Sequence, residues 1–250
     1  VDLLWFPTGG GKTEAYLGIV AFVLAIKRLR KENGGVNVLM RYTYRLLTIQ
    51  QFHRAAALMC ACESIRRNDK SMKWGTVPFR VGLFVGNDTT PNSLETAKNN
   101  LGSKSKKSNP VQMINCPWCG KSLDHHNYHV VKNPLRMAIK CANQNCTFGN
   151  KDDDESYLPV VFVDDDIIRT LPSLLIGTVD KFARLAWESK FAALFGKVSY
   201  YCGQHGFNPA GAQAGDTNHA DTMIKCKHSV VKIEEIKEMT KAQQAKVRKE

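Results

Sequence analysis

The sequence has few cysteines, no recognisable signal peptide and no apolar run long enough to cross a membrane. Eight cysteines among 250 residues are few for a secreted disulfide scaffold, and their clustering favours metal binding in a reducing compartment. The first residues contain neither a basic region nor a small-residue cleavage site. The apolar stretch 15–26 is shorter than the ~20 residues of a transmembrane helix. We therefore expect a cytoplasmic protein without a membrane partner.

Acidic residues are also scarce relative to basic ones. Lysine and arginine number 35 against 23 acids, which gives a net charge of +12 and a pI near 9.3. This surplus favours a polyanionic partner, nucleic acid above all, because phosphates that are neutralised release their counterions. At this length the chain can bury a full core and could hold one or two domains.

The strongest local pattern is a glycine-rich turn between an apolar segment, 3–6, and a helix expected at 13–31. Backbone N–H groups in such a turn form an anion-sized nest, and the helix N-terminus adds partial positive charge. The turn therefore predicts an ATP-binding loop, in which the lysine reaches the β- and γ-phosphates and the next threonine ligates Mg²⁺. The residues of this loop are Thr8, Gly9, Gly10, Gly11, Lys12 and Thr13.

Alternating apolar segments predict an α/β fold with a parallel sheet flanked by helices. A strand, a helix and a strand follow one another within about forty residues, which is the repeating unit of such a sheet. The aspartates at 164–166 are expected to end a strand, and the stretch 99–109 to form a flexible boundary. After the loop, strands are expected at 36–40, 79–86, 158–163 and 172–177, and helices at 50–67, from about 93, and at 182–195.

Two cysteine pairs predict a zinc ribbon. Cys116 and Cys119 are separated by two residues, Cys141 and Cys146 by four, and 21 residues lie between the pairs. Four thiolates complete a tetrahedral shell and leave no open position, so we expect structural zinc. The histidines between the pairs, His125, His126 and His129, are expected on the surface. Cys60 and Cys62 of the second helix are two residues apart and lie on different faces, so we expect them to be buried and not to share a metal.

A second group of metal-binding residue types follows at Cys202, His205, Cys226 and His228. Two cysteines and two histidines could close another tetrahedral zinc site. The single residue between Cys226 and His228 is a tighter spacing than most zinc chelates have, and the Gly/Ala-rich span before it is typical of disorder. The sequence is therefore compatible with one zinc ion per chain or with two.

Three segments resemble motifs of superfamily-2 helicases. The phosphate loop has Phe6 where the strict pattern has glycine, but the form x-x-T-G-x-G-K-T is common in that family. Residues 43–50, Thr-x-Arg-x-Leu-x-x-Gln, resemble motif Ia, and 177–182 resemble motif Ic with valine for proline and lysine for arginine. The resemblance implies a RecA-like domain whose Arg45, Gln50, Thr178 and Lys181 contact a nucleic-acid backbone. For residues 43–50 the alternative is an ordinary helix start with solvated Arg41 and Arg45. For 177–182 it is a helix N-cap by Thr178 with Asp180 in the first turn, which can hold together with the phosphate contact.

The combination of motifs, over roughly residues 1–200, resembles the large helicase of the DISARM phage-defence system and its relatives, which carry a Cys-rich insert in the first RecA-like domain. It implies an ATP-dependent helicase or translocase that binds nucleic acid, DNA more than RNA. The remainder of the parent helicase and other defence-system subunits are implied partners. The implied parts are a RecA-like segment at 1–100, the zinc ribbon at 110–150, a RecA-like continuation at 156–200, and an insert or tail at 201–250.

Several expected catalytic motifs are missing. The chain contains no Asp-Glu-x-His box after motif Ic, no Ser-Ala-Thr motif and no arginine-finger motif of a second RecA-like domain. Because hydrolysis needs carboxylates that hold Mg²⁺ and position water, we expect this piece alone not to turn over ATP. Alternatives are a zinc-containing nucleic-acid-binding module with a nucleotide-gated switch, and a P-loop kinase, which the motifs disfavour.

Overall fold

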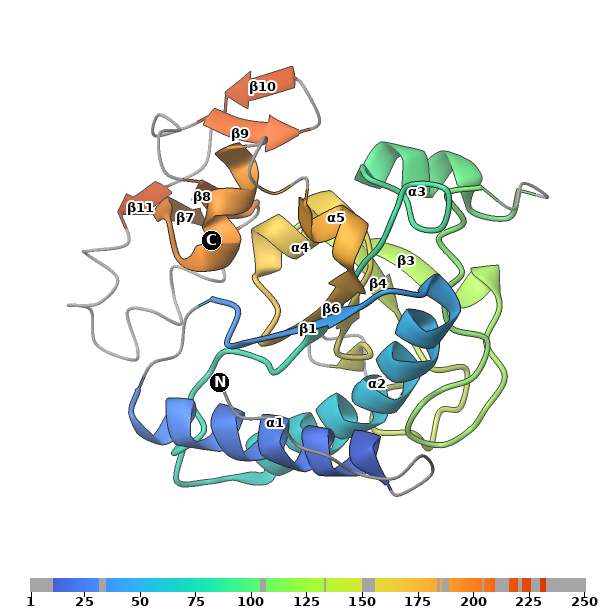
Figure 1. Cartoon of the computed structure of the whole chain (residues 1–250), viewed down its shortest axis with the longest axis vertical. Helices are drawn as coiled ribbons and strands as arrows, with labels where there is room; N and C mark the ends of the chain where they lie inside the picture. Colours follow the sequence, from blue (N-terminus) through green and yellow to red (C-terminus); the bar gives the residue numbers. More distant parts are fainter. Residues whose placement is uncertain are drawn as a thin grey trace.

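A computed structural model describes most of the chain (Figure 1). The described residues are 11–31, 35–103, 107–132, 134–149, 156–183, 185, 189–203, 205–209, 216–219, 222–225 and 230–232. Among them, no helix combines the length and the apolar character that a membrane crossing requires.

The centre of the fold is a four-stranded parallel sheet with the strand order β1-β6-β2-β5. Its neighbouring strands β1 and β6 are labelled in Figure 1. Leu174 of β6 pairs with Val38 of β1 on one side and with Val81 of β2 on the other. All four strands fall within or beside the expected stretches, so the predicted parallel α/β architecture is confirmed. The strands are β1 (Val38–Tyr42), β2 (Val81–Phe84), β5 (Val160–Val161) and β6 (Leu174–Thr178).

Helices cover both faces of this sheet (Figure 1). On β6, Leu174 and Ile176 pack in the core formed with α1 and α2, whereas Leu175 packs in a second core formed with α4. Since successive strand residues point to opposite sides, the inner strands are buried on both sides, whereas the edge strand β1 exposes Leu39 and Arg41 on one side. The helices are α1 (Lys12–Leu29), α2 (Arg45–Asn68), α3 (Leu94–Asn100), α4 (Asp164–Thr170) and α5 (Val179–Ala183).

Two helical segments differ from the expectation. Residues 164–166 follow a strand as expected, but they also begin α4, which the sequence pattern did not predict. Acidic side chains are favourable there because a helix N-terminus carries partial positive charge. The single helix expected at 182–195 is wrong within the described residues, since α5 ends at Ala183 and Ser189–Phe195 is a 3₁₀ helix. Its three-residue turn aligns Phe191 with Leu194, and both are buried.

The other strands form small antiparallel sheets. One hairpin, β3 with β4, follows a short 3₁₀ helix (His125–Asn127) within the expected zinc-ribbon region. Toward the C-terminal end, β7 lies between β8 and β11, and β9 pairs with β10. These strands are β3 (Tyr128–Val131), β4 (Arg136–Ile139), β7 (Val198–Cys202), β8 (Gly206–Pro209), β9 (Asp216–His219), β10 (Thr222–Lys225) and β11 (Val230–Lys232).

Gly177 in β6 lies too close to its neighbours for any side chain. A Cβ there would sit 2.3 Å from the Phe84 carbonyl oxygen and 2.9 Å from the Phe182 ring. We expect Gly177→Ala to lower the free energy of unfolding by ~1–3 kcal/mol, because backbone and ring must both shift. Gly18→Ala in α1 is the matched control: nothing lies within 4 Å of the added Cβ, so the change should be neutral or stabilising. Chemical denaturation compares the two, and equal midpoints would contradict the prediction.

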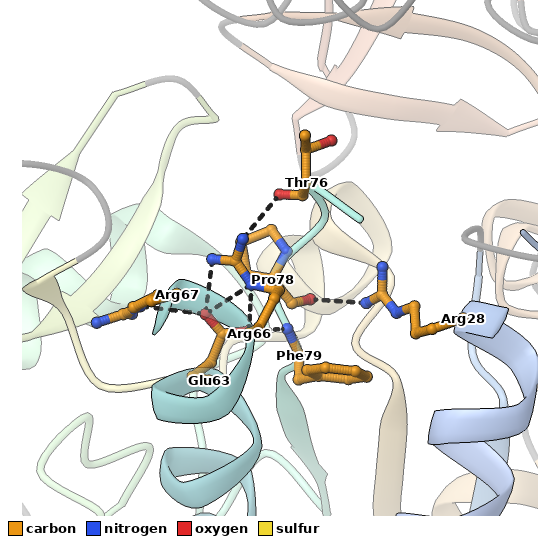
Figure 2. Close-up of polar contacts among 7 residues, drawn as sticks. All are labelled: Arg28, Glu63, Arg66, Arg67, Thr76, Pro78 and Phe79. Carbon is orange, nitrogen blue, oxygen red and sulfur yellow. Dashed lines mark hydrogen bonds and ion pairs between the residues drawn. The ribbon is translucent and has the colours of Figure 1, made fainter. Parts of the chain in front are cut away.

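A buried ionic cluster ties the end of α2 to the segment that enters β2 (Figure 2). The fully buried Glu63 carboxylate accepts hydrogen bonds from Arg66 Nε at 2.9 Å, from Arg67 Nε at 3.3 Å and from the Phe79 backbone N–H. A carboxylate that has lost its hydration needs such donors. The Arg28 guanidinium of α1 stacks on the Phe79 ring, 4.4 Å from its centroid. The cluster therefore holds α1, α2 and β2 together.

Candidate functional site

Four cysteine thiols meet in one place, as the spacing of the two pairs predicts. The Sγ atoms of Cys116 and Cys146 are 4.0 Å apart, those of Cys119 and Cys141 are 3.5 Å apart, and all four lie within 4.8 Å of one another. Tetrahedral zinc with bonds of about 2.3 Å to sulfur places its sulfurs about 3.8 Å apart. The donor set is therefore the right size for one ion, and the cluster could bind a metal such as zinc.

Backbone amides point at these sulfurs. The N–H of Asn143 donates to the Cys141 sulfur at 3.4 Å, and the N–H of Phe148 donates to the Cys146 sulfur at 3.5 Å. Burial raises the pKa of the Cys141 and Cys146 thiols, to about 11 for Cys146. At the more exposed Cys119, hydrogen bonds from the Lys121 amide and the neighbouring cysteines outweigh burial and lower the pKa to about 7. Such donors stabilise thiolate charge, and the thiolate is the form that binds metal.

The cysteine cluster is built into the main core of the protein. Three of its cysteines belong to the same buried hydrophobic cluster as Cys60 of α2. The Arg67 guanidinium of α2 stacks on the Phe148 ring, 4.9 Å from its centroid. On the other side, the Asp166 carboxylate of α4 accepts a hydrogen bond from the Met137 N–H of β4 at 2.8 Å. The insert is thus anchored to α2 and to α4.

The remaining cysteines and histidines of the insert and α2 lie where the sequence predicts. The three histidines of the insert are exposed, and none joins the four thiols. Cys60 is fully buried and Cys62 partly so, and burial raises the pKa of the Cys62 thiol to about 11. Both behave as small apolar residues rather than as metal ligands.

The second Cys/His group is only half described. Cys202 ends β7, and its sulfur lies 3.4 Å from Nδ1 of His205 in the turn to β8. Cys226 and His228 lie outside the described residues. The structure therefore brings the first two predicted ligands together and leaves the second two a prediction.

The predicted phosphate loop ends at the start of α1. Thr8, Gly9 and Gly10 lie outside the described residues. Gly11 precedes α1 with φ 72 and ψ 21, a left-handed conformation that glycine adopts without steric cost, and Lys12 and Thr13 form the first helical positions. An 18-residue helix thus begins directly after Gly11, and no described side chain caps its first N–H groups.

The residues that resemble motif Ia lie at the carboxyl edge of the sheet. Arg45 is the first residue of α2, directly after β1, and is exposed. Its Nη2 atom lies 3.7 Å from the position that a Cβ on Gly86 would take, just beyond β2. Gln50 is exposed one turn further along α2. This edge is where open α/β sheets bind their ligands.

The residues that resemble motif Ic are buried. Thr178 ends β6, and its hydroxyl has no hydrogen-bond partner among the described residues, so it does not cap α5. The Lys181 ammonium is paired with the Asp164 carboxylate and donates to Asn92 Oδ1 at 3.3 Å. Burial raises the pKa of Asp164 to about 6, although Lys181 opposes that rise. Contact between Lys181 and a phosphate stays a prediction, and it would require this ion pair to open.

Sequence reasoning missed the partners of these groups. The aspartates at 164–166 were expected only to end a strand, and Asn92 was not predicted to contact Lys181; the buried Glu63 was missed as well. Asp164 lies 17 residues before Lys181 in the chain, and no local spacing rule links the two. The three consecutive acids after an apolar strand were the available signal, because acids in a first helical turn commonly seek a cation.

The fold and these sites define a class: an α/β protein with a central parallel sheet, a helix that begins behind a left-handed glycine, and a four-cysteine cluster. No protein-family profile matches the chain. The chain is 42% identical over 227 residues to "DISARM protein DrmA" of Bacillus paralicheniformis, with 83% of this chain and 20% of that relative covered. The chain is thus similar to one part of that DISARM protein and spans about a fifth of its length.

Proposed function

We propose that this chain is the ATP-binding, RecA-like portion of an ATP-dependent nucleic-acid helicase or translocase that acts in anti-phage defence. The observation that carries the proposal is the start of α1 directly after the left-handed Gly11, with Lys12 and Thr13 on its first turn. A helix start of this kind binds phosphate through free N–H groups and the helix dipole. The identity to a DISARM protein supports the biological setting.

In this proposal the chain's own residues hold nucleotide and metal. Lys12 would contact the β- and γ-phosphates, and the Thr13 hydroxyl would ligate Mg²⁺, which neutralises the charge that develops during phosphoryl transfer. The carboxylates and arginine fingers that complete such a site would come from the rest of the parent protein. The zinc held by the four cysteines would be structural.

Nucleic acid would bind at the carboxyl edge of the sheet. Arg45 offers an exposed, forked guanidinium beside Gly86, a geometry suited to a backbone phosphate. The net charge of +12 favours a polyanionic partner, and we propose DNA before RNA. Further subunits of the defence system are proposed as protein partners.

The test is Lys12→Ala in the full-length protein, measured as DNA-stimulated ATP hydrolysis and as binding of a fluorescent ATP analogue. We expect hydrolysis to fall on the order of 10²–10³-fold, because one preorganised cation that stabilises developing charge is lost. Lys98→Ala, an exposed lysine in the last turn of α3, is the control and should leave both signals unchanged.

The outcomes separate the candidate functions. Hydrolysis that depends on DNA and on Lys12 supports the translocase. Nucleotide binding that depends on Lys12 but gives no turnover in the full-length protein would favour the nucleotide-gated zinc module instead. Unchanged nucleotide binding in Lys12→Ala would contradict the phosphate site itself.

A further inference from the structure

The Lys181 ammonium at the carboxyl edge of the sheet is engaged by other groups of the protein. It is paired with the Asp164 carboxylate, donates to Asn92 Oδ1 at 3.3 Å, and lies 4.9 Å from the centroid of the Phe84 ring. An ammonium has three N–H donors, and an anion, an amide oxygen and a ring face are partners for all three. In this arrangement Lys181 has no donor left for a phosphate.

The carboxylate side of this ion pair is the fixed side. The Asp164 N–H donates to the Pro91 carbonyl oxygen at 3.3 Å, and two residues further on the buried Asp166 carboxylate accepts from the Met137 N–H of β4 at 2.8 Å. The start of α4 is thus bonded to the loop before it and to the cysteine-rich insert. Lys181 reaches Asp164 from α5 on a flexible four-carbon stem. When the pair opens, the lysine therefore moves and the carboxylate stays.

The buried Asp164 carboxylate is only partly satisfied by its partners. Asp164 is 3% exposed, and its Oδ1 atom has no hydrogen-bond partner among the described residues. Burial raises the pKa of this carboxyl to about 6, although Lys181 and Lys190 lower it, and the neighbouring Asp165 adds to the rise. A carboxyl with this pKa can take up a proton when its cation leaves, which reduces the cost of opening a buried pair.

One short loop links Lys181 to the edge at which nucleic acid is proposed to bind. This loop follows β2 and runs from Gly86, beside the exposed Arg45, to Asn92, which accepts from Lys181. The Thr90 N–H donates back to the Gly86 carbonyl oxygen at 3.3 Å, which keeps the loop compact. Arg45 and Lys181 therefore flank the same loop at the same edge of the sheet.

We propose that Asp164 is a latch that withholds Lys181 from nucleic acid, and that a backbone phosphate displaces it when a strand binds. The inference rests on the proposed function and names the residue that sets the affinity at this edge. Before binding, the ion pair cancels the charge of Lys181, and after displacement Lys181 adds a second cation to Arg45. Removal of the Asp164 charge therefore strengthens binding, whereas loss of a purely structural ion pair would leave binding unchanged or weaken it.

The experiment measures the affinity of the full-length protein for a fluorescent single-stranded DNA oligonucleotide by anisotropy, over a range of salt concentrations. We expect Asp164→Asn to bind on the order of 3–10-fold more tightly, because binding no longer has to break an ion pair. Addition of Lys181→Met to Asp164→Asn should abolish this gain. It should also reduce the slope of log K against log salt concentration by about 0.7, the contribution of one phosphate contact with a single strand.

Asp165→Asn is the matched control. It removes the same charge one residue further along α4, where the carboxylate faces Arg169 at 3.8 Å, and it should leave the affinity unchanged. The latch is overturned by unchanged or weaker binding in folded Asp164→Asn, by an equal gain in Asp165→Asn, or by a gain that survives Lys181→Met.

Thermal unfolding of each variant checks that it is folded. If Asp164→Asn does not fold, Asn92→Ala tests the same point, because it removes one partner of Lys181 and leaves both charges in place. We expect a smaller gain in affinity there, and no gain would also overturn the latch. Absence of DNA binding in every variant would contradict the nucleic-acid function itself, whereas DNA binding that does not respond to Asp164 contradicts the latch alone.

Discussion

Cys146→Ser is expected to abolish metal binding at the four-cysteine cluster and to destabilise the core beneath it. A structural zinc contributes its binding free energy to folding, and three ligands hold the ion far more weakly than four. Because the cluster shares its core with α2, we expect a loss of several kcal/mol. At about 2–4 °C per kcal/mol for a chain of this length, the melting temperature should fall by about 10 °C or more.

The packing around Cys146 is the reason for so large an effect. The Cys146 sulfur accepts a hydrogen bond from the Phe148 N–H, and the Phe148 ring contacts both Arg67 of α2 and the Trp118 ring. Loss of a bound zinc ion would free this loop and expose that side of α2. Thermal unfolding with parallel zinc analysis measures the effect, and Cys62→Ser is the control that should change little. Full zinc occupancy at this cluster in Cys146→Ser would show that the four thiols do not share an ion.

Glu63→Gln is expected to lower the free energy of unfolding by ~3–5 kcal/mol, because it leaves buried arginine charge without its partner. The Glu63 carboxylate is fully buried and accepts from Arg66, Arg67 and the Phe79 N–H (Figure 2). An amide carries no charge and offers one acceptor oxygen where the carboxylate has two. Chemical denaturation monitored by circular dichroism measures the loss.

The chain offers a matched exposed pair as the control for Glu63. Glu14 and Arg54 approach to 2.9 Å, with their side chains 61% and 52% exposed. Exposed pairs of this kind contribute about 0–1 kcal/mol, so Glu14→Gln should leave the denaturation midpoint nearly unchanged. Equal effects of the two substitutions would mean that the buried Glu63 ion pairs contribute no more to the free energy of unfolding than an exposed pair does.

The strands, the long helices and the four-cysteine cluster were predictable from local sequence. Apolar runs such as 172–177 can only be buried on both faces, and that condition leads to a parallel sheet covered by helices. Likewise, Cys116 and Cys119 can bind one metal ion together only if the chain makes a tight turn between them, and the sequence predicts that turn without any tertiary contact. In each case the information lies within a few neighbouring residues.

The helix α4 and the burial of Lys181 were not predictable in this way. Asp164, Asp165 and Asp166 read locally as polar residues that end a strand. They are buried in the structure because cations and amides from elsewhere meet them: Lys181 pairs with Asp164, and the Met137 N–H donates to Asp166. Those partners lie 17 and 29 residues away in the chain, beyond the reach of any periodicity rule.

The sequence by itself determined the elements whose stability depends on their own residues: apolar strands, a helix behind glycines, and chelating cysteine pairs. Only the tertiary structure decided which charges face water and which face each other. Arg45 stays exposed beside Gly86, whereas Lys181, which resembles a phosphate-binding residue equally well, is turned toward Asp164. The physical reason is that the free energy of a charge depends on its solvation and its partners, and folding supplies both from distant parts of the chain.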